Sequence, residues 1–381
     1  MIRPVHGGNL AWAATLAGCP AAAILDFSAS ISPLGPPESA LDAIRSHLSS
    51  LTAYPDPDYG ELRAALGEAL NVDPDWILPG NGSAELLTWA ALDLSKLEAT
   101  YLVTPAFGDY SRALLAFDAQ VLDCPLDLKS LDAGTGNGLV TDDLSVFNRS
   151  FVSPALSLPV PLLNADRGLL LNNPHNPTGL LFGREAIRPY LEQLPMVVVD
   201  EAFMDFLPPS EQETLIDAVE EFPNLVILRS LTKFYSLPGL RMGCAIAHPD
   251  RLRRWQLQRD PWPVNTLAAA ATAAVLRDTV FEQKTWDWLP VARQELFEGL
   301  ANLPGLRPFP GAANFLLVES SISVSLVQKS LLERHRILIR DCLSFPELGD
   351  RFFRVAVRSR ADNLRLIAGL SEVLGHWSVD G

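Results

Sequence analysis

The sequence predicts an α/β protein with a mostly parallel central sheet between helices, followed by a smaller α+β region. Short aliphatic runs without strict polar alternation indicate strands buried on both faces. They lie at residues 101–103, 120–122, 168–171, 196–199, 225–228 and 244–247. Helical segments separate several of these runs, which is typical of parallel sheets. Strand-like runs then return at 315–319, 336–339 and 352–357, before a closing helix at 362–374.

The chain is expected to divide into an N-terminal arm (1–37), a large domain (38–254) and a small C-terminal domain (255–381). The arm is rich in Gly, Pro and Ser around one extended piece at 24–27. Helical spacing follows at 38–48 and 59–70, a tight glycine turn at 78–82 leads into a helix, and a long helical stretch begins after residue 249. The glycine cluster at 134–138 follows no strand and opens no helix, so it is expected to be a loop.

Composition and charge narrow the classes of function. The chain has 381 residues, 48% of them hydrophobic, and a formal net charge of −15, which repels nucleic acid. The longest small-apolar run is too short to span a bilayer, and the N-terminus lacks a signal-peptide core, so a cytoplasmic protein is expected. The four cysteines are far apart and lack metal-binding spacing, which fits a reducing compartment and predicts no metal site.

Lys233 is the residue around which the chemistry is expected to centre. It follows the strand-like run 225–228 and lies close to Ser230, Thr232 and Arg241. A lone Lys is more often a solvated surface charge. In a dry cleft near another cation, however, a Lys can be neutral enough to form a Schiff base, and two hydroxyls with an Arg match a phosphate dianion. Together these residues indicate pyridoxal 5'-phosphate (PLP).

Three more candidates lie at the ends of predicted strands. Asp200 ends a buried run, where a carboxylate is costly unless it is paired; a pyridine nitrogen would suit it, and a metal or a helix N-terminus are the alternatives. No His or Cys cluster accompanies Asp200, which disfavours a metal. Asn176 lies in an Asn-Pro turn and Phe107 follows the first of these strands, although either residue could be purely structural.

Six motifs occur in a fixed order along the chain: Gly-Asn-Gly-Ser-x-Glu (80–85), Pro-x-Phe (105–107), Asn-Asn-Pro-x-Asn-Pro-Thr-Gly (172–179), Asp-Glu-Ala-Phe (200–203), Ser-x-Thr-Lys (230–233) and Gly-Leu-Arg-x-Gly (239–243). In this order they resemble the fold-type-I PLP enzymes of the histidinol-phosphate aminotransferase branch, over essentially the whole chain. Segments 6–9, 26–29, 33–37, 232–235 and 238–241 are further similar to the L-threonine-O-3-phosphate decarboxylases, which supply aminopropanol phosphate to cobalamin biosynthesis.

The resemblance implies a role for each matched residue. Lys233 would be the Schiff-base lysine and Asp200 the partner of the pyridinium nitrogen. The other cofactor-binding residues would be Ser83, Ala84, Phe107, Asn176, Phe203, Ser230, Thr232 and Arg241, with Tyr54 reaching the phosphate from the second subunit of a homodimer. The substrate-binding residues would be His6, Gly7, Ser30, Asn176, Arg340 and Arg354, the last resembling the family's carboxylate-binding arginine.

Two departures from the family patterns leave alternatives open. Phe203 stands where the aminotransferases usually have Tyr, and Ser30-Ile31-Ser32 stands where the decarboxylases usually read Asn-Ile-Asn. Decarboxylation of L-threonine O-3-phosphate is the expected reaction, and transamination, as in histidinol-phosphate aminotransferase, is the runner-up. The orientation of the substrate at Cα decides between them. A PLP-binding regulator without turnover is disfavoured because the Lys, Asp and Arg set is complete and no DNA-binding segment is recognised.

Overall fold

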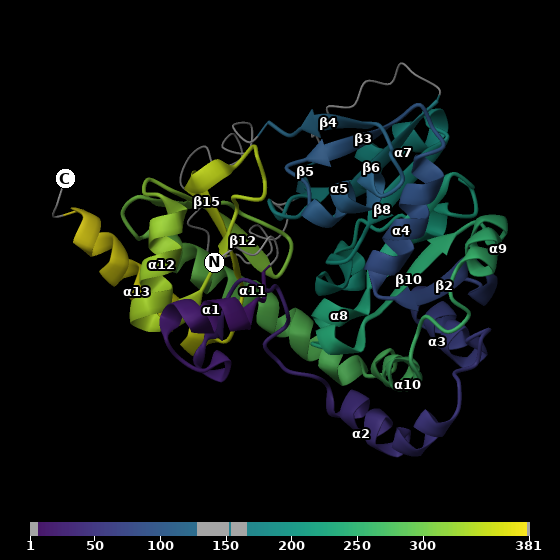
Figure 1. The fold of residues 1–381 in the computed structure, drawn as a ribbon, viewed down its shortest axis with the longest axis horizontal. Helices are drawn as coiled ribbons and strands as arrows, with labels where there is room; N and C mark the ends of the chain where they lie inside the picture. The colour runs from purple at the N-terminus through teal and green to yellow at the C-terminus, as the bar shows by residue number, and fades with distance from the viewer. Residues whose placement is uncertain (1–6, 128–151, 154–165, 379–381) are drawn as a thin grey trace.

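The computed structural model describes residues 7–127, 152–153 and 166–378, and its largest feature is a seven-stranded sheet (Figure 1). The strand order is β2 (Ile77–Asn81), β10 (Met242–Ala247), β9 (Leu225–Ser230), β8 (Met196–Asp200), β6 (Arg167–Asn172), β3 (Ala99–Thr104) and β4 (Val121–Pro125). Neighbouring strands are parallel except at β10, which runs antiparallel to both β2 and β9. The mostly parallel sheet expected from the sequence is confirmed.

Apolar side chains on both faces of this sheet are buried, which explains why its strands lack polar alternation. Leu169, Val197 and Ile227 belong to the core on one face, whereas Leu170 and Val198 belong to the core on the other. The first core is completed by residues of α3 (Gly60–Leu70), α7 (Arg184–Gln193) and α10 (Thr266–Val275). The second is completed by residues of α4 (Ser83–Leu94), α5 (Gly108–Leu115) and α9 (Pro249–Gln258).

A smaller antiparallel sheet is formed by the C-terminal part of the chain. Its order is β11 (Leu306–Pro308), β12 (Phe315–Ser320), β15 (Phe352–Ala356) and β14 (Arg340–Asp341). Helices α11 (Thr279–Ala301), α12 (Val324–His335) and α13 (Arg360–Ser378) lie beside it (Figure 1). This is the α+β region that the sequence predicted, while the division of the chain at residue 255 stays a prediction.

The N-terminal arm is attached to this smaller sheet's side of the molecule. Helix α1 (Leu10–Ala17) packs against α12, and β1 (Leu25–Asp26) pairs in parallel with β13 (Ile337–Leu338) (Figure 1). Buried Ala13 and Leu332 lie in one small apolar cluster between the two helices. The arm therefore connects the first residues of the chain to the segment that carries Arg340.

Three local expectations need correction. Residues 78–81 belong to the edge strand β2 rather than to a tight turn, and the turn itself is at Gly82. The helical stretch after residue 249 is three helices, because a proline-containing segment separates α9 from α10 and Asp278 begins α11 as its N-cap. Helix α1 was not predicted at all.

The remaining α-helices and strands are short or peripheral. They are α2 (Glu38–Ser46), the parallel pair β5 (Val152–Ser153) and β7 (Leu181–Phe182), and α8 (Leu231–Phe234). The expected loop at 134–138 lies outside the described residues. Among the residues that are described, no helix is both long and apolar enough to cross a bilayer.

Candidate active site

Lys233 lies in the single-turn helix α8, immediately after the central strand β9. Its Nζ donates to Ser230 Oγ at 3.1 Å, and Ser230 Oγ lies 2.8 Å from Thr232 Oγ1. Burial lowers the pKa of the amine to about 8; Asp200 opposes this shift, and Arg241 and Arg354 add to it. A lysine with this pKa has an appreciable neutral, nucleophilic fraction near neutral pH. The structure therefore brings Lys233 into the electrostatic field of three other predicted site residues.

Asp200 is the last residue of β8, the strand next to β9. Its Oδ2 accepts a hydrogen bond from the Tyr110 hydroxyl at 2.9 Å, and its Oδ1 accepts one from the Ala202 N–H at 3.0 Å. Burial raises the pKa of Asp200, while Lys233 and these two donors work in the opposite direction. A cationic ring nitrogen would favour the ionised carboxylate in the same way as Lys233 does.

Tyr110 is a site residue for which the sequence predicted no role. It lies on α5, is 2% exposed, and contacts Phe107 edge to face with ring centroids 5.7 Å apart. Burial and the nearby Asp200 carboxylate raise the pKa of Tyr110 well above its ordinary value, so the hydroxyl remains a donor. The only sequence feature that could have indicated a role for Tyr110 is its position three residues after Phe107.

A cradle of two glycines is formed where Gly82 joins β2 to α4. Gly82 has φ 73°, and a Cβ there would lie 2.5 Å from Arg241 Nη2; a Cβ at Gly243 would lie 2.5 Å from the backbone nitrogen of Ser83. The two glycines thus let the guanidinium and strand β10 approach the first turn of α4. The N–H groups of Ser83 and Ala84 have no partner within the helix, and the helix dipole favours an anion there.

Asn176 and Arg354 join the two sheets. Asn176 lies in the loop after β6. The side chain of Asn173 holds this loop, because it accepts a hydrogen bond from the Phe182 N–H and donates one to the Phe182 carbonyl, both at 2.9 Å. Arg354 of β15 donates from Nη1 to Asn176 Oδ1 and from Nη2 to the Ser28 carbonyl at 3.2 Å. Its guanidinium also lies over the Phe315 ring, 4.8 Å from the centroid.

Two buried arginines lie side by side at this junction. Arg340 and Arg354 are directly opposite each other on β14 and β15, and they are 7% and 8% exposed. Burial and the charge of Arg340 together lower the pKa of Arg354 to about 10. Arg340 Nη2 donates to Ser344 Oγ at 2.6 Å. Adjacent buried cations are favourable only where anions offset them, so this pair is suited to an anionic ligand.

The N-terminal arm extends from the neighbourhood of Arg340 and Arg354 to Lys233. The Gly8 N–H donates to Ser28 Oγ at 2.7 Å, and the Ser32 N–H donates to the Lys233 carbonyl at 3.0 Å. Between them Ser30 is 5% exposed, and its Oγ has no hydrogen-bond partner among the described residues. A Cβ at Gly7 would lie 2.3 Å from the Ser28 carbonyl oxygen. His6 lies outside the described residues.

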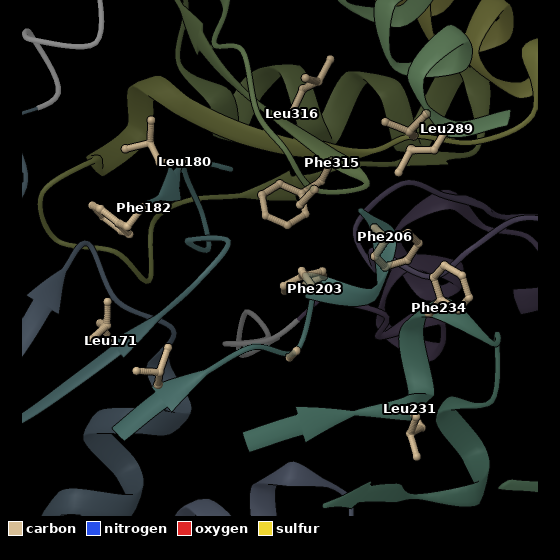
Figure 2. Packing of buried hydrophobic residues seen from close by; sticks show 14 of the residues in the cluster. Leu171, Leu180, Phe182, Phe203, Phe206, Leu231, Phe234, Leu289, Phe315 and Leu316 are labelled. Carbon is tan, nitrogen blue, oxygen red and sulfur yellow. The ribbon is translucent and has the colours of Figure 1, made fainter. Parts of the chain in front are cut away.

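Two predicted cofactor residues are aromatic and differ sharply in exposure. Phe203 is 4% exposed; Figure 2 shows it on the loop after β8, facing Phe315 of β12, and Lys233 Nζ lies 5.1 Å from its ring centroid. Phe203 offers no hydroxyl for a cofactor oxygen. Tyr54 is 79% exposed and stacks on Trp262 with centroids 4.4 Å apart. It lies at the surface.

Comparisons with known proteins show the family and the fold of this chain. Residues 22–370 match the family model described as aminotransferase class I and II. The threonine-phosphate decarboxylase of Salmonella typhimurium is 38% identical over 98% of both chains. The adenosylcobalamin biosynthesis bifunctional protein of Leptospira interrogans is 28% identical over 98% of this chain and 41% of its own length. The histidinol-phosphate aminotransferase structure from Clostridium acetobutylicum has a TM-score of 0.79 at 26% identity, covering 93% of this chain and all of that one.

Proposed function

This chain belongs to the aminotransferase class I and II family, and we propose that it is a PLP-dependent decarboxylase of L-threonine O-3-phosphate. Its product would be (R)-1-aminopropan-2-ol phosphate, for cobalamin biosynthesis. The observation that carries the proposal is the buried pair Arg340 and Arg354, placed directly opposite each other beside Asn176. The full-length similarity to a threonine-phosphate decarboxylase supports it.

The residues present fit PLP. The glycine cradle lets Arg241 and strand β10 approach the N-terminus of α4, so a cation and the first N–H groups of the helix lie together there and suit the cofactor phosphate. Lys233 would bond the aldehyde, and Asp200, held by Tyr110, would keep a proton on the ring nitrogen. Phe107 and Asn176 would contact the ring and its 3-oxygen. Bound PLP supplies an electron sink for the electron pair left at Cα when a substrate bond breaks.

Arg340 and Arg354 are expected to determine which bond at the substrate's Cα breaks. Guanidinium groups grip carboxylates and phosphates through paired hydrogen bonds, so a substrate carrying both anions would be held at two points. We assign the carboxylate to Arg354 and the phosphate to Arg340, with Gly7, Ser30 and His6 completing the subsite. Two fixed points set the rotation about Cα and so select the carboxylate as the leaving group.

Lys233 is also the best placed proton carrier. Loss of carbon dioxide leaves an electron pair on Cα, and one proton must then be added there. The Lys233 amine, whose pKa is about 8, can hold and release a proton near neutral pH. Ser230 accepts a hydrogen bond from Nζ and would keep the amine oriented between these steps.

A homodimer with shared sites is part of the proposal. Tyr54 is exposed together with Leu48 and Leu51, which gives an apolar surface next to the stacked Trp262. Such a surface is typical of an interface. Tyr54 would then reach the cofactor phosphate of the partner subunit. A cytoplasmic location remains a prediction from composition.

The proposal is tested by supplying the purified, PLP-loaded protein with L-threonine O-3-phosphate and no keto acid. We expect carbon dioxide in an amount equal to the substrate consumed. A parallel reaction contains histidinol phosphate and 2-oxoglutarate, because the family also includes aminotransferases. Glutamate formation in the second reaction, without gas release in the first, would overturn the proposal and assign transamination instead.

A further inference from the structure

The buried side-chain amide of Gln328 hydrogen-bonds the residues that come before and after Arg340 in the chain. Gln328 lies on α12 and is 4% exposed. Its Nε2 donates to the Ile339 carbonyl at 2.9 Å and to Asp341 Oδ2 at 3.0 Å. These two partners immediately precede and follow Arg340 in the chain. The backbone from which the Arg340 side chain projects is thus fixed to a helix.

Asp341 extends this connection to the guanidinium. It is 4% exposed, and its Oδ1 lies 4.0 Å from Arg340 Nη1 and accepts the Leu343 N–H at 3.4 Å. The turn held in this way carries Ser344, the residue that accepts a hydrogen bond from Arg340 Nη2. Asp341 therefore lies beside the Arg340 guanidinium and helps to hold the turn that hydrogen-bonds it.

An arginine fixed before the ligand arrives binds an anion more tightly than a mobile one, because less side-chain entropy is lost on binding. Asp341 can fix Arg340 only if its own carboxylate is held, and a buried carboxylate needs donors to stay in place. Gln328 provides such a donor from a helix that is itself anchored in the apolar core through Val324, Val327 and Leu331.

We propose that Gln328 is a positioning residue for the anion-binding Arg340, acts through Asp341, and raises the affinity of the enzyme for phosphorylated substrates. The inference rests on the proposed function, in which Arg340 receives the substrate phosphate. Gln328 has no part in proton transfer, so its loss changes binding rather than the chemical step.

The test is Gln328→Met in the PLP-loaded enzyme, which removes both hydrogen-bond donors and keeps an unbranched side chain. We expect the Kd of inorganic phosphate, measured by calorimetry, and the KM of L-threonine O-3-phosphate each to rise about tenfold, with kcat within about twofold. The matched control is Gln283→Met on α11. There an exposed Gln donates to Asp287 at 2.8 Å, and neither constant should change.

The route through Asp341 is tested by a double-mutant cycle with Asp341→Asn. If Gln328 acts through that carboxylate, Gln328→Met adds little to the effect of Asp341→Asn. Fully additive effects would overturn the route. A lower Tm with unchanged phosphate Kd and KM would reduce Gln328 to a structural residue and overturn the inference. If Gln328→Met weakens phosphate binding but wild type releases no carbon dioxide, the inference stands and the proposed reaction fails.

Discussion

Burial shifts the pKa of both Lys233 and Asp200, because it penalises the charged form of each side chain. The pKa of the lysine falls to about 8 and that of the aspartate rises, so each group moves toward neutrality when nothing is bound. The neutral amine is the form that attacks an aldehyde. A neutral Asp200, in contrast, cannot stabilise a positively charged pyridinium. The Tyr110 hydroxyl favours the ionised form of Asp200, because it donates a hydrogen bond to the carboxylate.

Tyr110→Phe should therefore change the pH dependence of the reaction. Removing a hydrogen-bond donor to the ionised carboxylate raises the pKa of Asp200 further. Asp200 is then protonated at a higher pH, so the acidic limb of the kcat/KM profile moves to higher pH. The measurement is the pH profile of kcat/KM for the variant and for wild type. Tyr101→Phe is the control, because Tyr101 is a similarly buried residue whose hydroxyl accepts from Arg167 instead. An acidic limb at the same pH in Tyr110→Phe and wild type would contradict the assignment.

The sequence could locate Lys233 and Asp200 but not the Tyr110 contact. Each of the first two directly follows or ends a recognisable strand, and the chemistry of its side chain is informative there. The Tyr110 contact joins residues 90 positions apart. It depends on β3, β6 and β8 being neighbours in that order, which no local pattern specifies.

At the scale of elements, the junction between β2 and α4 is where local structure produces a binding feature. Gly82 has φ 73° and ψ 162°, a conformation that Gly adopts far more readily than other residues. The sequence predicted the helix start at this place but interpreted residues 78–81 as a turn, because Pro79 and Gly80 are unfavourable in most strands. They are accommodated because β2 is an edge strand paired only with β10.

Gly82→Ala should weaken PLP binding. The added Cβ would lie 2.5 Å from Arg241 Nη2 in a strained backbone conformation, so either the guanidinium or the first turn of α4 must move. We expect the Kd of PLP to rise at least about tenfold. The control is Gly18→Ala, which also has positive φ but open space around its Cβ. If the two variants lose stability equally and both bind PLP as wild type does, the cradle is not the phosphate site.

At the scale of the whole molecule, the site lies where two sheets and the N-terminal arm make contact through Arg354, Asn176 and Ser28. Figure 1 shows the two sheets and the arm. Arg354 reaches Asn176 from the small sheet, and nearby the Ala312 N–H donates to the Gly179 carbonyl at 2.7 Å. The sequence predicted both sheets and the arm, but composition and periodicity contain no information on how separate sheets dock. From the sequence, only the family resemblance assigned Asn176 and Arg354 to one site.

Gly311→Ala should loosen this docking and raise the KM of the substrate. A Cβ at Gly311 would lie 3.1 Å from Gly179 Cα, so the loops on the two sheets must separate slightly and carry Arg354 away from Asn176. We expect a rise of about fivefold, since small misplacements at a two-point binding site are costly. Steady-state kinetics provide the measurement, with Gly375→Ala as the control because nothing lies within 4 Å of its Cβ. An unchanged KM for Gly311→Ala would show that the docking tolerates the shift.

The proposed dimer predicts complementation between two inactive variants. Lys233→Ala removes the Schiff-base lysine, and Tyr54→Ala removes the residue that reaches the partner's phosphate. In a hybrid dimer one site keeps both Lys233 and the Tyr54 of the other subunit. Differently tagged subunits are co-expressed, and the hybrid is purified on both tags. Carbon dioxide release by the hybrid, well above that of either variant, is the expected result. Inactivity of the hybrid would place Tyr54 within its own subunit's site, whereas an active Tyr54→Ala variant would place Tyr54 outside any site.

The central claim is that Arg340 and Arg354 direct breakage of the carboxylate bond rather than of the Cα–H bond. It is tested most directly by converting L-threonine O-3-phosphate in heavy water and examining the product by NMR and mass spectrometry. We predict aminopropanol phosphate with a single deuterium on the carbon that bears the amine, because one solvent-derived proton replaces the lost carboxylate. A keto acid product, or recovered substrate with deuterium at Cα and no loss of carbon dioxide, would contradict the account.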